Sequence, residues 1–115
     1  MGDYRRLEVW KLSTQLAVAV YRATEQFPPW ERFGLTAQLR RAVISVSSNI
    51  AEGSGRGSQP ELRRFISIAR GSLHEVSSQL CVARELHLLA DANWGEIDAQ
   101  IDRISRMLLG LARIK

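Results

Sequence analysis

The sequence is poor in several residue types that would define other classes of protein. Its 115 residues include one cysteine, two histidines and three prolines. The single cysteine, Cys81, cannot form an internal disulfide, which is typical of proteins from a reducing compartment. No apolar run is long enough to cross a membrane, and none of signal-peptide length follows the amino terminus. We therefore expect a cytoplasmic protein that makes no membrane contact.

Lysine is nearly absent as well, because only Lys11 and Lys115 accompany the fourteen arginines among the sixteen basic residues. The formal net charge is +4. A guanidinium group pairs with phosphate or carboxylate through two parallel hydrogen bonds, so the arginine bias favours phosphate contacts. A GC-rich genome produces the same bias, and the charge alone therefore leaves nucleic-acid binding open.

Histidine is too sparse and too isolated to indicate a catalytic or metal centre. His74 and His87 are thirteen positions apart, and within residues 59–89 neither has a carboxylate or a second histidine three or four residues away, the spacing typical of metal sites in helical bundles. We expect His74 to be exposed and His87 to lie in the core. No serine follows a strand as in a nucleophile elbow. The sequence predicts no catalytic residue, no metal and no cofactor, and an enzyme is the weakest hypothesis.

Apolar residues recur with the period of an α-helix in four segments, which predict one domain over residues 1–115. The expected helices cover residues 7–26, residues 31 or 35 to 53, residues 59–89, and a last segment after an N-cap at Asn93. Short connections between them predict an all-α, antiparallel up-down-up-down four-helix bundle with a long third helix. Phe27 and Trp30, which flank two prolines, are expected to cap the end of the core.

The second expected helix carries two apolar stripes, roughly 150° apart at 100° per residue. The broader stripe suits the core of the subunit. The narrower stripe has smaller side chains and predicts contact with another copy of the chain. Its members, the predicted oligomer interface, are Ala37, Ile44 and Ala51.

A glycine-rich bend, residues 53–58, connects the second and third expected helices. It follows a helix and not a strand, so it is unlike a phosphate-binding loop. We expect Gly53 to end the helix in the left-handed conformation and Ser58 to cap the next one. Folding the hairpin about Arg56 places Gly71 level with Arg41, and Gly71 is expected to allow close approach of the two backbones.

Two polar residues near the end of the second expected helix are predicted to be structural. Asn49 lies at the edge of the core stripe, where an unpaired amide would cost about 1 to 3 kcal/mol. We expect it to bond to a backbone group of the next helix or of the bend. Glu52 is expected to form an ion pair with Arg63 or Arg64.

Arginines remain as the candidate ligand-binding groups. Arg40 and Arg41 are consecutive, Arg70 is expected to lie level with them, and Arg56 lies at the bend. The amino-terminal arm adds Arg5 and Arg6. The nucleic-acid-binding residues predicted from the sequence are therefore Arg5, Arg6, Arg40, Arg41, Arg56 and Arg70.

Several short motifs resemble a known protein family. They are Leu7-Glu8-Val9-Trp10-Lys11, Phe27-Pro28, Gln38-Leu39-Arg40-Arg41-Ala42, Asn49-Ile50-Ala51-Glu52-Gly53 and Ile68-Ala69-Arg70-Gly71-Ser72-Leu73-His74-Glu75. These are similar to motifs of the four-helix-bundle proteins encoded in intervening sequences of bacterial large-subunit ribosomal RNA genes, which resemble the accessory protein of diversity-generating retroelements. The resemblance implies a cytosolic homopentamer with a basic surface, implicated in RNA or DNA binding, without enzymatic activity. Arg5-Arg6 departs from the acidic residues common there.

Two functions follow as hypotheses. The first is a non-enzymatic, oligomeric scaffold that binds RNA or DNA through arginine–phosphate contacts. The alternative is a protein-interaction module, whose arginines bind an acidic partner or a reverse-transcriptase-like protein.

Overall fold

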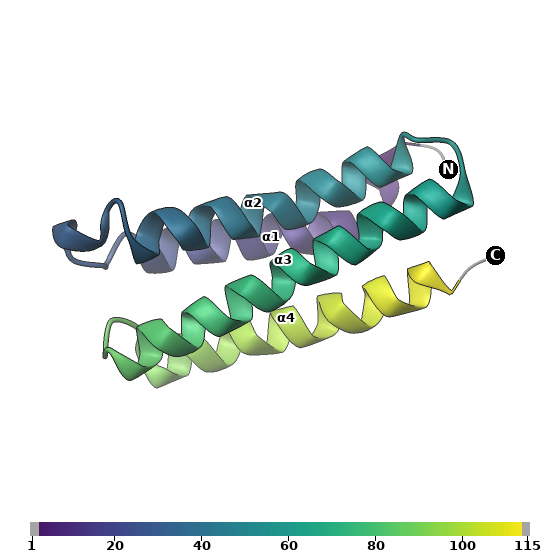
Figure 1. Ribbon diagram of the computed structural model, residues 1–115. Helices are drawn as coiled ribbons and strands as arrows, with labels where there is room; N and C mark the ends of the chain where they lie inside the picture. Colours follow the sequence, from purple (N-terminus) through teal and green to yellow (C-terminus); the bar gives the residue numbers. More distant parts are fainter. Residues whose placement is uncertain (1–2, 114–115) are drawn as a thin grey trace.

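The computed structural model describes residues 3–113, which form four α-helices and two short 3-10 helices (Figure 1). No strand occurs among these residues. The elements in chain order are η1 (Tyr4–Arg6), α1 (Glu8–Thr24), η2 (Pro29–Glu31), α2 (Leu35–Ser54), α3 (Gln59–Glu85) and α4 (Asp91–Ala112).

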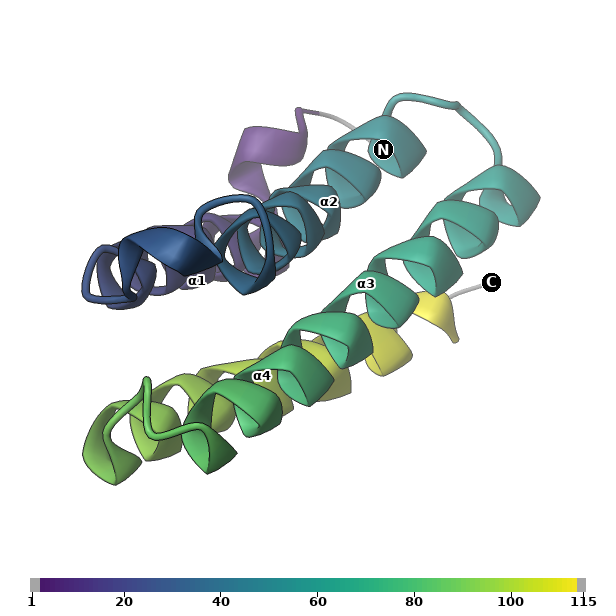
Figure 2. The ribbon, with the colours of Figure 1, turned by 60° about the vertical axis from the view of Figure 1, so that its left-hand side comes forward.

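Consecutive helices run antiparallel and form two layers, with α1 beside α2 and α3 beside α4 (Figures 1 and 2). The bundle is 43 Å long, and the most extensive packing joins α2 to α3 across the layers. The predicted all-α up-down-up-down bundle is confirmed, as is the long third helix, which has 27 residues. None of the helices within residues 3–113 has the length and apolar character needed to span a bilayer.

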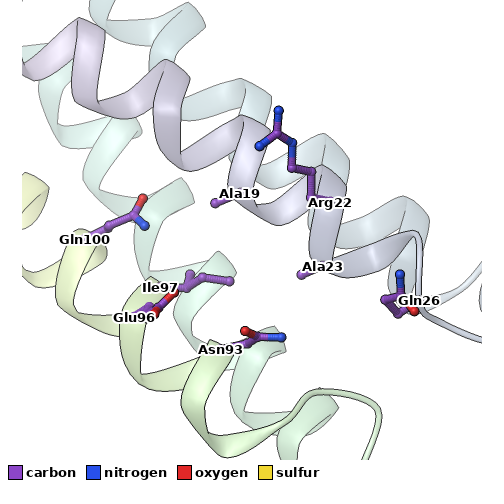
Figure 3. A pocket seen from close by; sticks show the side chains of 8 residues that line it. All are labelled: Ala19, Arg22, Ala23, Gln26, Asn93, Glu96, Ile97 and Gln100. Atoms are coloured by element: carbon purple, nitrogen blue, oxygen red, sulfur yellow. The ribbon is translucent and has the colours of Figure 1, made fainter.

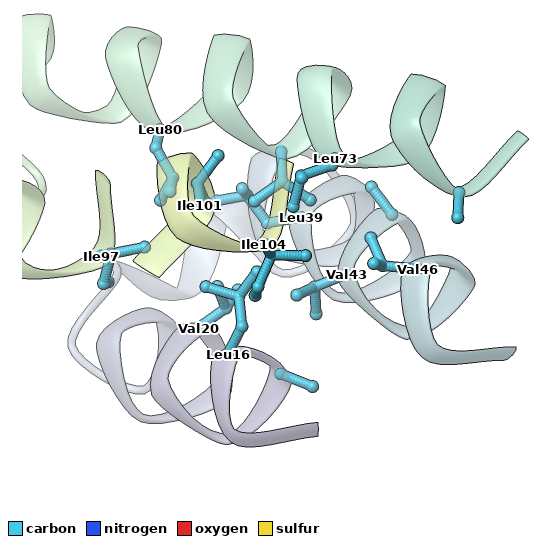
Figure 4. Close-up of a cluster of buried hydrophobic side chains, with 14 of the residues drawn as sticks. Leu16, Val20, Leu39, Val43, Val46, Leu73, Leu80, Ile97, Ile101 and Ile104 are labelled. Carbon is cyan, nitrogen blue, oxygen red and sulfur yellow. The ribbon is translucent and has the colours of Figure 1, made fainter. Parts of the chain in front are cut away.

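The core lies along the axis of the bundle, where each helix contributes one apolar face (Figure 4). Leu16, Leu39 and Leu73 are fully buried, and Ile104 is 1% exposed. Phe27 caps one end of this core as predicted, with 8% of its surface exposed. Trp30 does not, because 81% of its surface is exposed, and the prediction that it covers the core is wrong. Trp30 lies in η2, the short 3-10 helix that follows Pro28 between α1 and α2.

Gly53 is a helix-contact residue and not a helix-ending one. The helix continues through Ser54, and the bend reaches a positive φ, of 80°, only at Gly57. A Cβ atom on Gly53 would lie 2.7 Å from the Cβ of Phe65 on α3. The predicted left-handed conformation is therefore wrong, since the residue is needed for close packing between α2 and α3. Ser58 caps α3 as predicted, because its Oγ accepts a hydrogen bond from the Glu61 amide at 3.3 Å.

The register between α2 and α3 differs from the predicted one. Arg41 is paired with Glu75 at 2.6 Å, and the hydroxyls of Ser45 and Ser72 lie 2.8 Å apart. Gly71 is exposed, and a Cβ placed on it would meet no atom of another helix within 4 Å. The prediction of close backbone approach there is wrong. The reason is that α3 begins beyond the end of α2. Every residue of α3 is therefore displaced towards the bend, and Arg41 meets Glu75 in place of Gly71.

α3 ends four residues earlier than predicted, at Glu85. His87 adopts a φ of 60°, its amide donates to the Arg84 carbonyl, and the Leu88 amide donates to the Ala83 carbonyl at 2.9 Å. This pattern is a Schellman motif, in which the left-handed residue is usually glycine. His87 is exposed, so its predicted core position is wrong.

The start of α4 also differs from the prediction. The helix begins at Asp91 and its N-cap is Ala90, whereas Asn93 lies within the first turn. Asp91 suits this position because an acidic side chain is favourable at the positive end of a helix dipole. Its ion pair with Arg84, at 2.9 Å, further ties the turn to α3.

Candidate nucleic-acid interface

Arg40, one of the arginines predicted to bind nucleic acid, is engaged within the subunit. Its Nε donates to Thr24 Oγ1 at 2.9 Å, and its Nη2 donates to the carbonyl of Tyr21 at 3.3 Å. The guanidinium group lies 4.6 Å from the centre of the Tyr21 ring. These contacts join α2 to the end of α1, so Arg40 is already used to hold the first layer together.

Arg41 and Arg56 form ion pairs on the surface. Arg41 bonds to Glu75 across the α2–α3 contact, whereas Arg56 bonds to Glu52 at 3.2 Å. The predicted partners of Glu52, Arg63 and Arg64, are therefore wrong, because Glu52 pairs with Arg56, four residues further along in the bend after α2. Exposed pairs of this kind contribute about 0 to 1 kcal/mol, so a phosphate can compete for either arginine.

The amino-terminal arginines lie next to α1 on the short helix η1. Arg5 donates to both carboxylate oxygens of Asp3, with the shortest distance 2.8 Å. The side-chain bond from Arg5, and then the bond from its backbone amide, lower the pKa of Asp3. Arg6 is exposed. One arginine of this pair is thus neutralised locally, and the other faces solvent.

The charged residues of the α3/α4 layer are separated by sign along the length of the bundle. Residues 59–70 and 102–113 carry six arginines and two acidic residues, a net charge of +4. Residues 71–101 carry five acidic residues and one arginine, a net charge of −4. The basic half lies at the end with the α2–α3 bend and the carboxyl terminus (Figure 1). The basic half of the α3/α4 layer therefore carries as much net positive charge as the whole chain.

The register of α3 against α4 places arginines opposite one another. Arg84 pairs with Asp91, and His74 and Ser77 line one hollow together with Asp98 and Asp102. Paired residue numbers in this layer thus sum to about 176. Continued towards the bend, this register places two arginines of α3 level with two of α4. We call this set the arginine ladder, and it consists of Arg63, Arg70, Arg106 and Arg113.

The ladder is only partly neutralised by neighbouring carboxylates. Arg106 pairs with Asp102 at 2.8 Å, and both side chains are mainly exposed. Arg63 is exposed and makes no ion pair among residues 3–113. The Nε atom of Arg70 is buried and has no hydrogen-bond partner in the same range. Arg70 forms no ion pair among residues 3–113, so no carboxylate in this range neutralises its charge.

The sequence interpretation found Arg70 but not the other members of the ladder as binding residues. Arg63 and Arg70 are seven residues apart, as are Arg106 and Arg113, so each pair occupies one side of its helix. The sequence alone shows this spacing. It does not show the register of α3 against α4, which depends on where α3 ends. With α3 extended to Leu89, the two pairs do not align.

Asn49 satisfies its amide group within its own helix. Its Nδ2 donates to the Ser45 carbonyl at 2.8 Å and to Ser45 Oγ at 2.9 Å. Ser45 Oγ in turn bonds to Ser72 on α3. The predicted partner on the next helix or the bend is wrong, although the chain of hydrogen bonds reaches α3 through Ser45. Asn49 therefore supports the α2–α3 contact and does not face a ligand.

The predicted oligomer interface lies on the outer surface of α2. Ile44 is 43% exposed, Ala37 is exposed and Ala51 is half-buried. On the neighbouring helix α1, Val18 and Tyr21 are 49% and 37% exposed. The first layer thus has an apolar outer surface that the single subunit leaves in solvent.

A groove between α1 and α4 has a volume of about 460 Å³ (Figure 3). Ile97 points from α4 into it, Ala19 and Ala23 form the opposite wall, and Arg22 points away from α4. Among residues 3–113, no three histidine, cysteine, aspartate or glutamate side chains are grouped as a metal site. The groove is open and brings together no set of groups suited to proton transfer.

The fold and this surface define a class of protein: an antiparallel four-helix bundle with a basic face across two of its helices. The chain belongs to the family of 23S rRNA-intervening sequence proteins, whose family model matches residues 5–110. No curated protein sequence matches it. A crystal structure from Bacteroides thetaiotaomicron, described as a protein of unknown function from the S23 ribosomal protein family, is similar with a TM-score of 0.82. The two chains are 18% identical, and the match covers 92% of this chain and 99% of the other, so the shared property is the fold.

Proposed function

We propose that the protein is a non-enzymatic cytoplasmic scaffold that binds RNA or DNA through arginine–phosphate contacts on the α3–α4 face. The observation that carries the proposal is the arginine ladder within the half-layer of net charge +4. Four guanidinium groups on one side of two neighbouring helices match the repeated charge of a phosphate backbone better than isolated surface arginines do.

The geometry of the ladder favours contact with the backbone over the reading of bases. Seven residues of α-helix span about 10.5 Å, so successive arginines on each helix can reach phosphates that are not adjacent. Phosphate contacts fix position and orientation but carry no direct sequence information. The proposed binding is therefore weakly selective for sequence and strongly dependent on salt.

Assembly would repeat this face. We propose that copies join through Ala37, Ile44 and Ala51 on the first layer, as a homopentamer. The ladder belongs to α3 and α4, which form the other layer (Figure 2), so it would stay accessible. Repetition of a basic face around a closed ring multiplies the number of phosphates that one nucleic acid can contact. A modest charge per chain would then produce a strong local potential.

The test is a binding titration of the purified full chain with single-stranded and double-stranded RNA and DNA across a salt series. The proposal predicts that log K falls linearly with log salt concentration. Replacing Arg63 and Arg70 by glutamine removes two contacts and should reduce the slope by roughly 1.4 per engaged subunit on a single strand. Circular dichroism of the variant checks that the bundle is intact.

A matched control removes two positive charges elsewhere. Lys11 and Arg22 are both exposed on α1, outside the α3/α4 layer. The variant with glutamine at both positions has the same net charge as the ladder variant and should bind almost as the unmodified protein does. An equal loss of nucleic-acid affinity in the ladder variant and in the control variant would contradict a binding site on α3 and α4. Binding of an acidic protein, with none to nucleic acid at low salt, would favour the alternative interaction module.

A further inference from the structure

The two most exposed large apolar side chains described belong to the short connection between α1 and α2. Trp30 is 81% exposed and Phe33 is 85% exposed. The next most exposed such residue, Leu86, reaches only 54%. Aromatic rings normally contribute large buried areas to a core or an interface, so two rings left in solvent indicate a contact with another molecule.

The connection holds these rings in an ordered backbone. Pro28 and Pro29 restrict its entry, and the amides of Glu31, Arg32 and Gly34 donate to carbonyls three residues earlier, at 2.9 to 3.1 Å. The Glu31 carboxylate accepts a hydrogen bond from the first amide of α2, at 3.1 Å. We call residues 28–34 the aromatic tip. Its rings are presented by a hydrogen-bonded turn, which limits the entropy lost on binding.

The two rings lie three residues apart in the same exposed connection. Trp30 belongs to η2, which ends at Glu31, and Phe33 belongs to the turn that follows it before α2. The only cation that lies over either ring is the guanidinium group of Arg32, 5.1 Å from the centre of Phe33, among the described residues. The tip therefore combines aromatic faces with one adjacent positive charge.

The surroundings of the tip are positive as well. Residues 28–41 contain three arginines and one glutamate, a net charge of +2. That glutamate, Glu31, is already bonded to the start of α2. A partner with flat apolar rings and negative charge complements both properties, and an unpaired nucleotide is such a partner.

We propose that the aromatic tip binds unpaired nucleobases of single-stranded RNA or DNA by stacking on Trp30 and Phe33, with Arg32 beside the phosphates. This inference rests on the proposed function and narrows its ligand to nucleic acid that contains single-stranded segments. It adds a second contact at the opposite end of the bundle from the arginine ladder. Stacking accepts every base, so this contact also requires no particular sequence.

The tip can be tested by its own fluorescence. Replacing Trp10 and Trp94 by phenylalanine leaves Trp30 as the only tryptophan of the chain. Both replacements keep an aromatic ring where Tyr4 packs on Trp10 and where Arg84 covers Trp94. Titration with an oligouridylate of about twelve nucleotides should quench Trp30, whereas an abasic strand with equally many phosphates should not.

Affinity is measured in parallel with variants of the tip. Trp30→Ala and Phe33→Ala should each weaken binding of the oligouridylate roughly tenfold, with little change for a blunt duplex. Phe33→Leu keeps an apolar side chain but no aromatic face and should behave as Phe33→Ala does. Phe33→Tyr should restore binding. Solution mass and circular dichroism are recorded for every variant.

The outcomes separate this inference from the proposed function. Unchanged affinity in the tip variants, with weakened binding when Arg63 and Arg70 are replaced, would overturn stacking and leave the ladder intact. A change of solution mass without a specific loss of single-strand binding would assign the tip to a protein interface and also overturn it. An unmodified protein that binds no strand at low salt would refute both proposals.

Discussion

Alanine at Gly53 should destabilise the bundle, although alanine is the better helix former. A Cβ there would lie 2.7 Å from the Cβ of Phe65 and 3.5 Å from a methyl group and the carbonyl of Leu62. Carbon atoms pack best at about 3.5 to 4.0 Å, so α2 and α3 would have to separate by nearly 1 Å. Both Cβ atoms are fixed to backbone, and a rotamer change cannot relieve the contact. Overpacking of this kind costs about 1 to 3 kcal/mol.

The opposite result is expected for the same substitution at Gly71. This residue lies in the middle of α3 and is exposed, and a Cβ atom added to it would meet no atom of another helix within 4 Å. Alanine there gains the full difference in helix propensity, about 1 kcal/mol. The two substitutions add the same methyl group to a helical glycine and differ only in the space available. Their stabilities should therefore differ by the overpacking cost alone, about 1 to 3 kcal/mol.

Urea and thermal unfolding, followed by circular dichroism at one fixed protein concentration, measure both effects. The concentration must be fixed because any assembly contributes to stability by mass action. In a domain of this size, about 1 kcal/mol changes Tm by roughly 4 °C. Gly71→Ala should raise Tm and Gly53→Ala should lower it. Equal or greater stability of Gly53→Ala would show that α2 and α3 are not packed as closely as the structure has them.

Two further predictions concern the ends of helices. His87→Gly should stabilise the protein by roughly 0.5 kcal/mol, measured as a higher urea midpoint, because glycine adopts the left-handed conformation without strain; a lower midpoint would contradict the Schellman geometry. At the amino terminus, carbon-13 NMR should give Asp3 a pKa below its ordinary 3.8, which rises in Arg5→Gln. The stabilisation from this contact is fully present above the ordinary pKa of Asp3 and is lost as the pH falls through its lowered pKa. An unchanged pKa of Asp3 in Arg5→Gln would contradict this assignment.

The fold was predictable because helical periodicity is a property of local sequence. The apolar stripe of α2 and the prolines after α1 fix the elements to within a few residues. The short connections between the four helices add the antiparallel order. None of these signals depends on how far one helix slides along another.

The candidate site was less predictable because it depends on that sliding. The local sequence predicted that the chain reverses at Arg56. In the structure α3 begins beyond the end of α2, so Arg41 lies level with Glu75 and not with Gly71. A left-handed histidine is a weaker stop signal than glycine, so the end of α3 at Glu85 was missed. The alignment of Arg63 with Arg113 required the second correction, because the α3–α4 register depends on where α3 ends.

The separation of charge in the α3/α4 layer is not an arrangement that maximises stability. Mixing the signs along these helices would create more pairs at i, i+4, each worth a few tenths of a kcal/mol. In the present arrangement, two guanidinium groups about 10 Å apart repel by only about 0.4 kcal/mol in water, and salt reduces this further. The loss is therefore small and tolerable, while the field of a basic half-layer reaches a polyanion before contact. A surface that gives up a little stability for a concentrated charge is the arrangement that the proposed binding of nucleic acid predicts.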